Sequence, residues 1–170
     1  MGSQSVITLV LGGARSGKSR HGEGLITALP GPWTYIATAE AWDAEMAARI
    51  ALHRAQRVIG WQTVEAPLTL PSALAAAGET PVLVDCLTLW LTNLMLAERD
   101  LTAETEALLA AMEARRAPTV LVANEVGLGI VPEHRLGREF RDAAGVLHQR
   151  LAARAERVFF MVAGLPMVVK

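Results

Sequence analysis

The feature that most constrains this chain is a short glycine-rich run that fits the phosphate-binding loop pattern G-x-x-x-x-G-K-[ST], namely Gly12-Gly13-Ala14-Arg15-Ser16-Gly17-Lys18-Ser19. An apolar, β-type run at residues 6–11 precedes it, and a helical pattern follows over residues 18–28. A strand, a glycine-rich turn and a helix N-terminus direct backbone N–H groups at an anion, and the helix dipole adds positive potential there. The sequence therefore predicts a nucleotide site.

Each part of this loop has an expected task. Gly12 and Gly17 permit backbone conformations that a side chain would block. Lys18 can reach the β- and γ-phosphates as a catalytic cation, and the Ser19 hydroxyl can ligate Mg²⁺. We predict nucleotide contacts along the whole loop, from Gly12, Gly13, Ala14, Arg15, Ser16, Gly17, Lys18 and Ser19.

Composition bounds the class of protein. The chain has 170 residues, which suits a single domain over residues 1–170, and it is 52% apolar and 19% charged, as folded globular proteins are. A net charge of −1 gives no global basic field for nucleic acid or anionic lipid. One cysteine excludes an intrachain disulfide and a multi-cysteine zinc site, and we expect Cys86 to be a small buried apolar residue.

The sequence shows no targeting segment and no apolar run long enough to span a bilayer. The apolar run at residues 6–11 is too short for a signal peptide and leads directly into the phosphate loop. We therefore expect a soluble cytoplasmic protein, with no membrane and no nucleic-acid partner, in a compartment where GTP, ATP and Mg²⁺ are available.

The alternation of strand and helix patterns predicts an α/β fold. Strands are expected at residues 6–11, 34–38, 82–85, 119–124 and 158–163, and helices at 18–28, 43–54, 70–77, 89–98, 102–115 and 136–155. The strand runs are nearly continuous in apolar residues, which is typical of parallel strands covered on both faces. We predict a P-loop NTPase-type, RecA-like domain with a mostly parallel sheet flanked by helices.

Finer features of this fold are also predicted. Asp43 and Thr102 are the expected N-caps of their helices. Residues 167–169 follow a Gly-Leu-Pro turn and are expected to return as an antiparallel edge strand.

An acid stands at the end of one predicted strand. Asp85 follows Val82-Leu83-Val84, so it is expected at the carboxyl edge of the sheet near the metal held by Ser19, where it can bind Mg²⁺ directly or through water. The alternative is that Asp85 caps the turn or helix that follows.

One histidine is a candidate nucleophile. His53 shares a helical face with Met46 and Ile50, and Arg49, Arg54 and Arg57 surround it in the sequence. Nearby cations favour the neutral, nucleophilic form of an imidazole and neutralise phosphate oxygens. A histidine on an apolar stripe is, however, often only a packed core residue, so the residues alone leave both interpretations open.

Several of these runs together resemble one family. They are the loop GGARSGKS with the following RH, the runs YIAT and DAEMAARI, the His53-Arg54 step, the segment WQTVE and the loop NEVGLGIVP. Together these runs are similar to the bifunctional adenosylcobinamide kinase / adenosylcobinamide-phosphate guanylyltransferases of cobalamin synthesis. The resemblance covers nearly the whole chain, from residue 6 to residue 170.

The resemblance implies two reactions. A nucleoside triphosphate, ATP or GTP, phosphorylates adenosylcobinamide, and GTP then transfers GMP to adenosylcobinamide phosphate, giving adenosyl-GDP-cobinamide and pyrophosphate. The second reaction passes through a guanylylated histidine, and the matching position here is His53. The resemblance further implies a homotrimer, and it implies nucleotide contacts outside the loop from Thr38, Ala39, Glu40, Arg54, Ala55, Gln56, Arg57, Glu65 and Asp85.

Two further carboxylates and an amide have less specific roles. Glu65 is suited to bind the N1–H and 2-amino group of guanine, or it is a solvated strand-end acid. Asn124 and Glu125 open a glycine-containing loop at the ligand edge of the sheet, where they are candidates for contact with the corrinoid substrate or a metal-bound water. The alternative for these two residues is a structural turn.

Two other functions are compatible with the phosphate loop alone. A monofunctional small-molecule kinase would transfer the γ-phosphate without forming covalent GMP. A nucleotide switch would bind nucleotide and partners without turnover of a corrinoid. A switch has no need for a histidine flanked by basic residues or for the NEVGLGIVP loop, and these features favour the bifunctional enzyme.

Overall fold

The computed structural model describes residues 6–41, 43–55 and 57–170, and within helix 44–55 it leaves the side chains of Arg49, His53 and Arg54 undescribed. The predicted nucleotide contact Gln56 therefore lies outside the described residues. His53 and Arg54 are placed only by the helix to which their backbone belongs.

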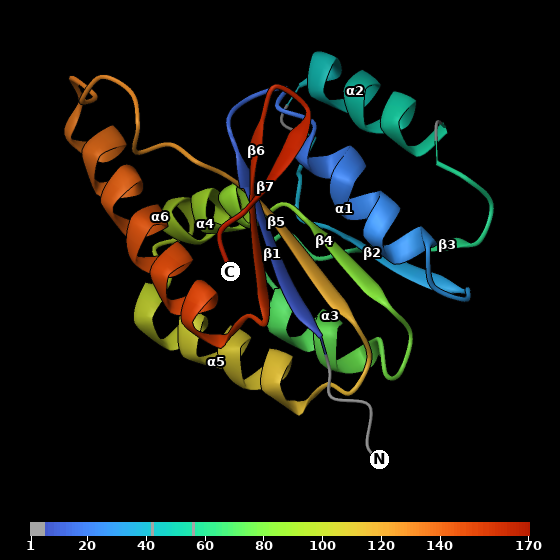
Figure 1. Ribbon diagram of the computed structural model, residues 1–170. Helices are drawn as coiled ribbons and strands as arrows, with labels where there is room; N and C mark the ends of the chain where they lie inside the picture. The colour runs from blue at the N-terminus through green and yellow to red at the C-terminus, as the bar shows by residue number, and fades with distance from the viewer. Residues whose placement is uncertain (1–5, 42, 56) are drawn as a thin grey trace.

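A mixed sheet of seven strands forms the centre of the described chain (Figure 1). Its strands are β1 (Ile7–Gly12), β2 (Trp33–Ala37), β3 (Trp61–Glu65), β4 (Val82–Asp85), β5 (Thr119–Asn124), β6 (Arg157–Val162) and β7 (Leu165–Val168). They lie in the order β3-β2-β4-β5-β1-β6-β7, and β7 alone pairs antiparallel, with β6. The predicted parallel sheet and the antiparallel C-terminal edge strand are confirmed.

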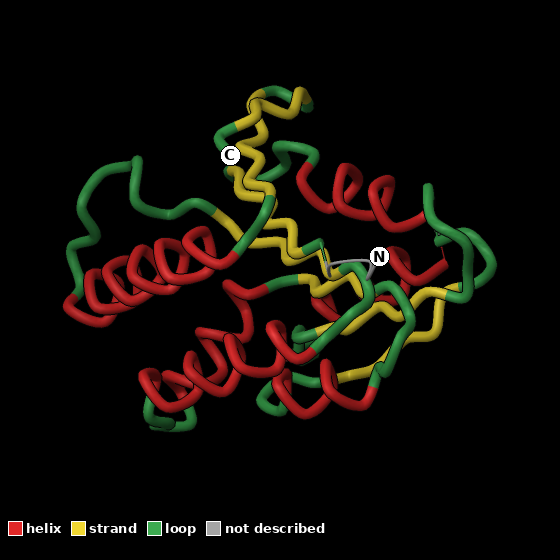
Figure 2. Tube along the Cα trace, turned by 60° about the horizontal axis from the view of Figure 1, so that its bottom comes forward, coloured by secondary structure: helices red, strands yellow, loops and turns green. Residues whose placement is uncertain are grey.

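Helices cover both faces of the sheet (Figure 2). The described helices are α1 (Lys18–Thr27), α2 (Ala44–Ala55), α3 (Leu70–Ala76), α4 (Leu87–Leu96), α5 (Leu101–Ala114) and α6 (Arg135–Arg154). Each lies within two residues of its predicted range at both ends. In Figure 1, α1 lies on one side of the sheet, whereas α3, α4, α5 and α6 lie on the other.

The buried side chains divide between these two faces. Leu9 and Leu121 belong to a large core that they share with Leu74, Leu94 and other residues of α3 to α6. Their sequence neighbours on the same strands, Val10 and Val122, belong to a second core under α1. Because successive strand residues point to opposite faces, both faces are apolar, which explains the continuous apolar runs of the central strands.

Strand β3 is absent from the strands predicted above. Its residues Trp61–Glu65 pair only with β2 and are mostly exposed, because β3 is an edge strand. Such a strand needs no continuous apolar run, and its sequence contains Gln62 and Thr63 among apolar residues. The pattern that identified the central strands therefore missed it.

The helix caps agree with the prediction in one case of two. The Asp43 carboxylate accepts the backbone N–H of Met46 at 2.7 Å and so caps α2, as predicted. The prediction of Thr102 as the cap of α5 was wrong, because Asp100 accepts the N–H groups of Thr102 and Ala103 at 2.9 and 3.1 Å. A carboxylate at this position satisfies two N–H groups that the helix itself leaves unpaired.

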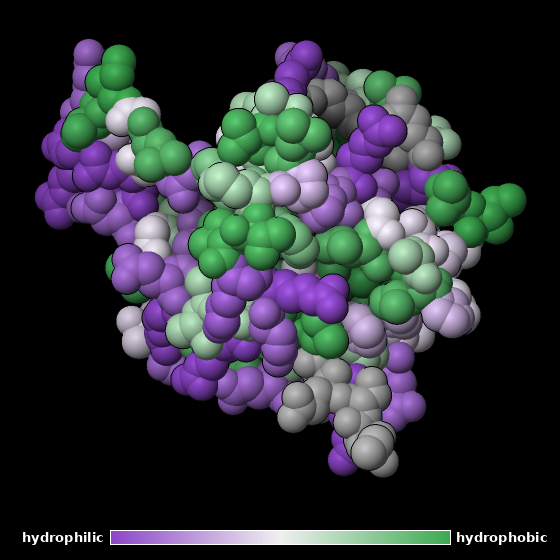
Figure 3. Space-filling view, viewed as in Figure 1, coloured by the Kyte–Doolittle hydropathy of each residue, from purple (hydrophilic) through white to green (hydrophobic). Residues whose placement is uncertain are grey.

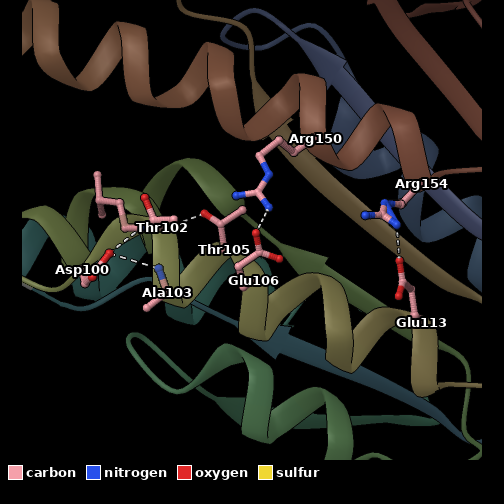
Figure 4. A network of polar contacts seen from close by, with 9 residues as sticks. Asp100, Thr102, Ala103, Thr105, Glu106, Glu113, Arg150 and Arg154 are labelled. Atoms are coloured by element: carbon pink, nitrogen blue, oxygen red, sulfur yellow. Dashed lines mark hydrogen bonds and ion pairs between the residues drawn. The ribbon is translucent and has the colours of Figure 1, made fainter.

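Helices α5 and α6 are joined on their exposed sides by two ion pairs (Figure 4). Arg150 pairs with Glu106, and Arg154 donates to Glu113 at 2.8 Å.

Among the described residues, no helix is long and apolar enough to cross a membrane.

Candidate active site

The carboxyl ends of the parallel strands meet at one edge of the sheet. Ala37 at the end of β2 is in register with Asp85 on β4 and with Glu65 on β3. Gly12 at the end of β1 is in register with Asn124 on β5. Ligands of open α/β sheets bind at this edge, and the predicted site residues therefore converge there.

The phosphate loop connects β1 to α1 in the predicted arrangement. Gly17 has a φ of 90°, in the left-handed region that favours glycine, and it precedes the first residue of α1. The Lys18 ammonium donates to the carbonyl oxygen of Gly13 at 3.0 Å and so closes over the loop. The turn thus leaves the helix N-terminus open to an anion, with one cation folded across it.

The end of the sheet supports this loop closely. A side chain at Gly12 would collide with the Ser16 hydroxyl and lie 3.0 Å from the Cβ of Met161 on β6. The backbone N–H of Glu125 donates to the Gly12 carbonyl at 2.9 Å. The requirement for glycine at position 12 is therefore steric.

A cleft of about 1020 Å³ opens beside the loop. Ser19 of α1 and Asp85 of β4 line it, and so do Met46, Ala47 and Ile50 of α2. Figure 1 shows α2 (teal) at the carboxyl end of the sheet, beyond α1. The helical stripe that contains Met46 and Ile50 in the sequence is thus turned toward the cleft.

Some of the predicted contact residues line this cleft and others do not. Outside the loop, six of the nine predicted residues whose side chains the structure describes line it, namely Ala39, Glu40, Arg57, Glu65, Asp85 and Asn124. Ala55 is exposed at the end of α2. The site residues that the sequence argument missed are mainly apolar, among them Pro67 and Leu89, since apolar residues carry no chemical signature.

Thr38 lies beneath the cleft surface. It is fully buried, and its hydroxyl donates to the Cys86 carbonyl at 2.6 Å and accepts the Cys86 N–H at 3.0 Å. Asn93 donates to the Thr38 carbonyl at 2.8 Å. The side chain of Thr38 therefore holds the end of β2 against the start of α4.

Cys86 is buried, as predicted. Burial raises the pKa of its thiol to about 11, with a further contribution from the neighbouring Asp85 carboxylate. The thiol is therefore protonated at neutral pH and is unsuited to act as a nucleophile.

Glu125 is directed into its own loop. One of its carboxylate oxygens accepts the N–H of Gly127 at 2.6 Å, and the other lies 3.9 Å from Nδ1 of the buried His148. Asn124 lines the cleft, while its N–H donates to the Thr88 hydroxyl at 2.7 Å. Of this predicted pair, the structure brings only Asn124 to the cleft.

Asp85 has a neighbour that the sequence argument did not single out. The Tyr35 hydroxyl donates to Oδ2 of Asp85 at 2.6 Å, and both side chains line the cleft. Burial and the Asp85 carboxylate raise the pKa of the Tyr35 phenol well above its usual range, so the phenol remains a donor. Nothing in the local sequence of β2 indicated this contact, since it joins two strands.

The oxygen groups of this cleft fit a hard divalent cation. Ser19 supplies a hydroxyl and Asp85 a carboxylate, and Mg²⁺ typically takes one or two protein ligands together with substrate phosphates. Within the described ranges, no group of three or more His, Cys, Asp or Glu side chains is placed to hold a metal by itself. The donor set therefore suits an ion that arrives with a nucleotide.

The whole-chain sequence comparison decides the family. The profile of the cobinamide kinase / cobinamide phosphate guanyltransferase family matches residues 8–169. This chain belongs to that family. A bifunctional adenosylcobalamin biosynthesis protein, CobP of Pseudomonas aeruginosa, is 52% identical over 166 residues, which are 95% of this chain and 96% of the relative.

Other relatives agree. The bifunctional adenosylcobalamin biosynthesis protein CobU of Salmonella typhimurium is 43% identical over 182 residues, which cover 97% of this chain and all of the relative. The protein of that name from Escherichia coli K12 matches to the same extent. These matches support the enzyme class inferred from the motifs, a nucleotide-using transferase of cobalamin synthesis.

A solved structure agrees on the fold at much lower identity. A protein of Pyrococcus horikoshii superposes with a TM-score of 0.54 at 10% identity, over 99% of this chain and 88% of its own. This likeness concerns the architecture alone.

Proposed function

We propose that this chain catalyses two successive transfers to a corrinoid. It phosphorylates the aminopropanol hydroxyl of adenosylcobinamide with ATP or GTP, and it then joins GMP from GTP to the new phosphate. Family membership and the names of the relatives support both steps. The observation that carries the proposal is that Ser19, the last residue of the phosphate loop, and helix α2 line one cleft.

His53 is the proposed nucleophile of the second transfer. It lies three residues after Ile50 on α2, and residues three apart share a helix face. Ile50 lines the cleft, which supports the placement of position 53 toward the same space. The neighbouring Arg54, Ala55, Gln56 and Arg57 are proposed nucleotide contacts, of which Arg57 lines the cleft.

The proposed guanylyl transfer has two balanced displacements. A neutral imidazole nitrogen of His53 attacks the α-phosphorus of GTP, a P–N bond forms, and the bond to the departing pyrophosphate breaks. A phosphate oxygen of adenosylcobinamide phosphate then attacks the same phosphorus, and the P–N bond breaks to restore the imidazole. Division into two displacements replaces one difficult step by two easier ones.

The phosphate loop would stabilise charge on the transferred and departing phosphates. Lys18 would exchange its bond to the Gly13 carbonyl for a phosphate oxygen, while the N–H groups at the start of α1 face the anion. Ser19 and Asp85 would hold Mg²⁺, which neutralises negative charge on the phosphates when bound.

Recognition of the base is proposed for the β3 side of the cleft. Glu65 lines the cleft at the end of β3, and a carboxylate can accept both the N1–H and the 2-amino group of guanine. Ala39 and Glu40, which follow β2, also line the cleft, and the adjacent Thr38 is buried. On the other side Asn124 is a candidate contact for the corrinoid side chain, and Glu125 would shape the loop behind it.

A homotrimer with active sites between subunits is the proposed assembly. Exposed apolar side chains support an association surface of this kind, since large apolar patches on a soluble chain mark interaction sites. In Figure 3 such residues gather over the loop between β5 and α6, where Leu128 and Ile130 are 79% and 98% exposed. Leu165 and Val168 of β7 are each 71% exposed.

The covalent step is tested with GTP labelled at the α-phosphorus. The purified protein is incubated with Mg²⁺ and the labelled GTP, denatured, and examined for label bound to the chain. We expect a label that is lost in acid, survives base and is absent from His53→Ala. His134→Ala is the matched control, because His134 is an exposed histidine at the start of α6.

Two outcomes would contradict the proposal. Label that persists in His53→Ala would assign the nucleophile to another residue. A protein that binds GTP and transfers its γ-phosphate to adenosylcobinamide, yet retains no α-label, would be a kinase without the covalent mechanism.

A further inference from the structure

Three side chains that line the cleft are in contact, from the loop before β3, across β2, to the end of β4. The Arg57 guanidinium carbon lies 3.2 Å from the centroid of the Tyr35 ring, and the Tyr35 hydroxyl donates to Asp85 at 2.6 Å. Arg57 also donates to the Thr63 hydroxyl on β3 at 2.9 Å. The loop after α2 is thereby connected, through one aromatic ring, to the acid at the end of β4.

The sheet register explains why these residues meet. Tyr35 on β2 is in register with Thr63 on β3 and with Leu83 on β4. Asp85 lies two residues beyond Leu83, so it projects from the same face of the sheet as Leu83 and Tyr35. The long phenol can therefore reach diagonally across to the Asp85 carboxylate.

The Tyr35 ring is held on more than one side. Trp61 meets it edge to face, with ring centroids 5.7 Å apart, and Arg57 covers its face. Tyr35 as a whole is 2% exposed, so its ring has little room to rotate away. A donor fixed in this way can restrict the carboxylate that accepts its hydrogen bond.

We propose that Tyr35 is a positioning residue for Asp85, and that Arg57 acts on Asp85 through Tyr35. The inference rests on the proposed function, in which Asp85 holds Mg²⁺ and Arg57 contacts the nucleotide. It adds a physical connection between those two tasks. A bound nucleotide that orders Arg57 would restrict the motion of the Tyr35 ring. The ring would in turn restrict the Asp85 carboxylate beside the cation.

Removal of one hydroxyl tests the first part. Tyr35→Phe keeps the ring, its contact with Trp61 and the surface under Arg57, but it removes the bond to Asp85. Residues that orient metal-binding carboxylates typically contribute 10- to 100-fold to metal affinity. We expect the affinity for Mn²⁺ in the presence of a non-hydrolysable GTP analogue, followed by electron paramagnetic resonance, to fall by about tenfold.

Two further measurements separate positioning from general damage. Affinity for the GTP analogue in excess chelator should be unchanged in Tyr35→Phe. In the phosphorylation of adenosylcobinamide by GTP, kcat should fall by a larger factor than KM for GTP changes. The matched control is Thr92→Val, which removes a hydroxyl that donates within α4. Unchanged Mn²⁺ affinity, or an equal loss of nucleotide affinity in chelator, would overturn the role of Tyr35.

Because the chain has a single tyrosine, a second test can leave Tyr35 itself unaltered. The ¹³Cζ resonance of labelled tyrosine reports the Tyr35 hydroxyl without a substitution at that residue. We expect this resonance to move in Asp85→Asn and on addition of Mg²⁺ with the GTP analogue. A resonance that stays in place in Asp85→Asn would overturn the proposal even if Tyr35→Phe failed to fold.

A double-mutant cycle tests the role of Arg57. If Arg57 acts through Tyr35, the loss of Mn²⁺ affinity in Arg57→Ala should shrink when Tyr35 is already phenylalanine. Independent, additive losses would overturn this part. These measurements need no guanylyl transfer, so a failure of the proposed covalent chemistry would remain distinguishable from a failure of this inference.

Discussion

The backbone N–H of Gly164 donates a hydrogen bond to the carbonyl oxygen of Ser16 at 3.0 Å. This bond joins the turn between β6 and β7 to the phosphate loop. The two backbones approach closely, because a side chain at Gly17 would lie 3.3 Å from the Cα of Gly164. The last two strands thus contribute to the site although they supply none of the predicted contact residues.

Gly164→Ala should weaken both the fold and the loop. Gly164 has a φ of 80°, and a residue with a side chain costs about 1–2 kcal/mol in the left-handed region. We expect a loss of about 1 kcal/mol in the free energy of unfolding, measured in urea, together with weaker GTP binding by calorimetry.

Gly78→Ala is the matched control for that prediction. Gly78 has a φ of 58°, no heavy atom lies within 4 Å of an added Cβ, and it follows α3 away from the phosphate loop. We expect a similar loss of stability with normal GTP affinity. Equal GTP affinity in the two variants would show that the turn does not support the loop.

Two glycines of α1 should respond in opposite directions to alanine. A Cβ at Gly22 would lie 3.0 Å from both Leu83 and Val122, which are fully buried in the sheet. Gly24 has no heavy atom within 4 Å of an added Cβ. We expect Gly22→Ala to lose about 1–3 kcal/mol through overpacking and Gly24→Ala to gain up to about 1 kcal/mol of helix propensity. Urea denaturation checks both values, and a stabilised Gly22→Ala would refute the close packing.

Substitution of Arg115 should lower the free energy of unfolding more than substitution of most other polar residues. It is buried, and its guanidinium donates to the Thr119 hydroxyl and to the carbonyls of Leu74, Gly78 and Thr80. Removal of the side chain would leave several buried acceptors unpaired, and each such group costs about 1–3 kcal/mol. We expect Arg115→Ala to lower the free energy of unfolding by at least about 3 kcal/mol.

The neighbouring Arg116 supplies the comparison for this test. Arg116 is exposed, and substitution of an exposed side chain usually changes stability by less than about 0.5 kcal/mol. Thermal or urea unfolding of Arg115→Ala and Arg116→Ala measures the difference. Similar stabilities for the two variants would mean that the Arg115 bonds contribute little.

His148 should make the stability of the fold depend on pH. Burial lowers the pKa of His148, and the nearby Glu125 carboxylate offsets this only in part. The unfolded chain therefore binds the proton more readily than the folded chain. Stability should fall as the pH drops below the unfolded value of about 6.5, because protonation then favours unfolding.

Substitution separates this effect from other titrating groups. We expect the free energy of unfolding of His148→Gln to fall less than that of the unaltered chain between about pH 7.5 and pH 5.5. The exposed His134→Gln should follow the unaltered chain. Identical pH dependence in His148→Gln and the unaltered chain would refute the argument.

The local sequence determined those features that depend on neighbouring residues. The run from Gly12 to Ser19, with the apolar residues before it and the helical pattern after it, specified a strand, a turn and a helix, since these are properties of one continuous segment. Apolar runs marked the central strands, because burial on both faces leaves a continuous pattern. The terminal acid Asp85 could be placed at the sheet edge for the same reason.

Only the tertiary structure decided which segments meet. The insertion of β4 between β2 and β5 brings Asp85 to Tyr35, and the return of β7 brings Gly164 to Ser16. Glu125 follows β5 at the ligand edge, yet the structure directs its carboxylate to Gly127 and toward His148. Such pairings depend on packing free energy summed over residues distant in the chain, and no local pattern contains that sum.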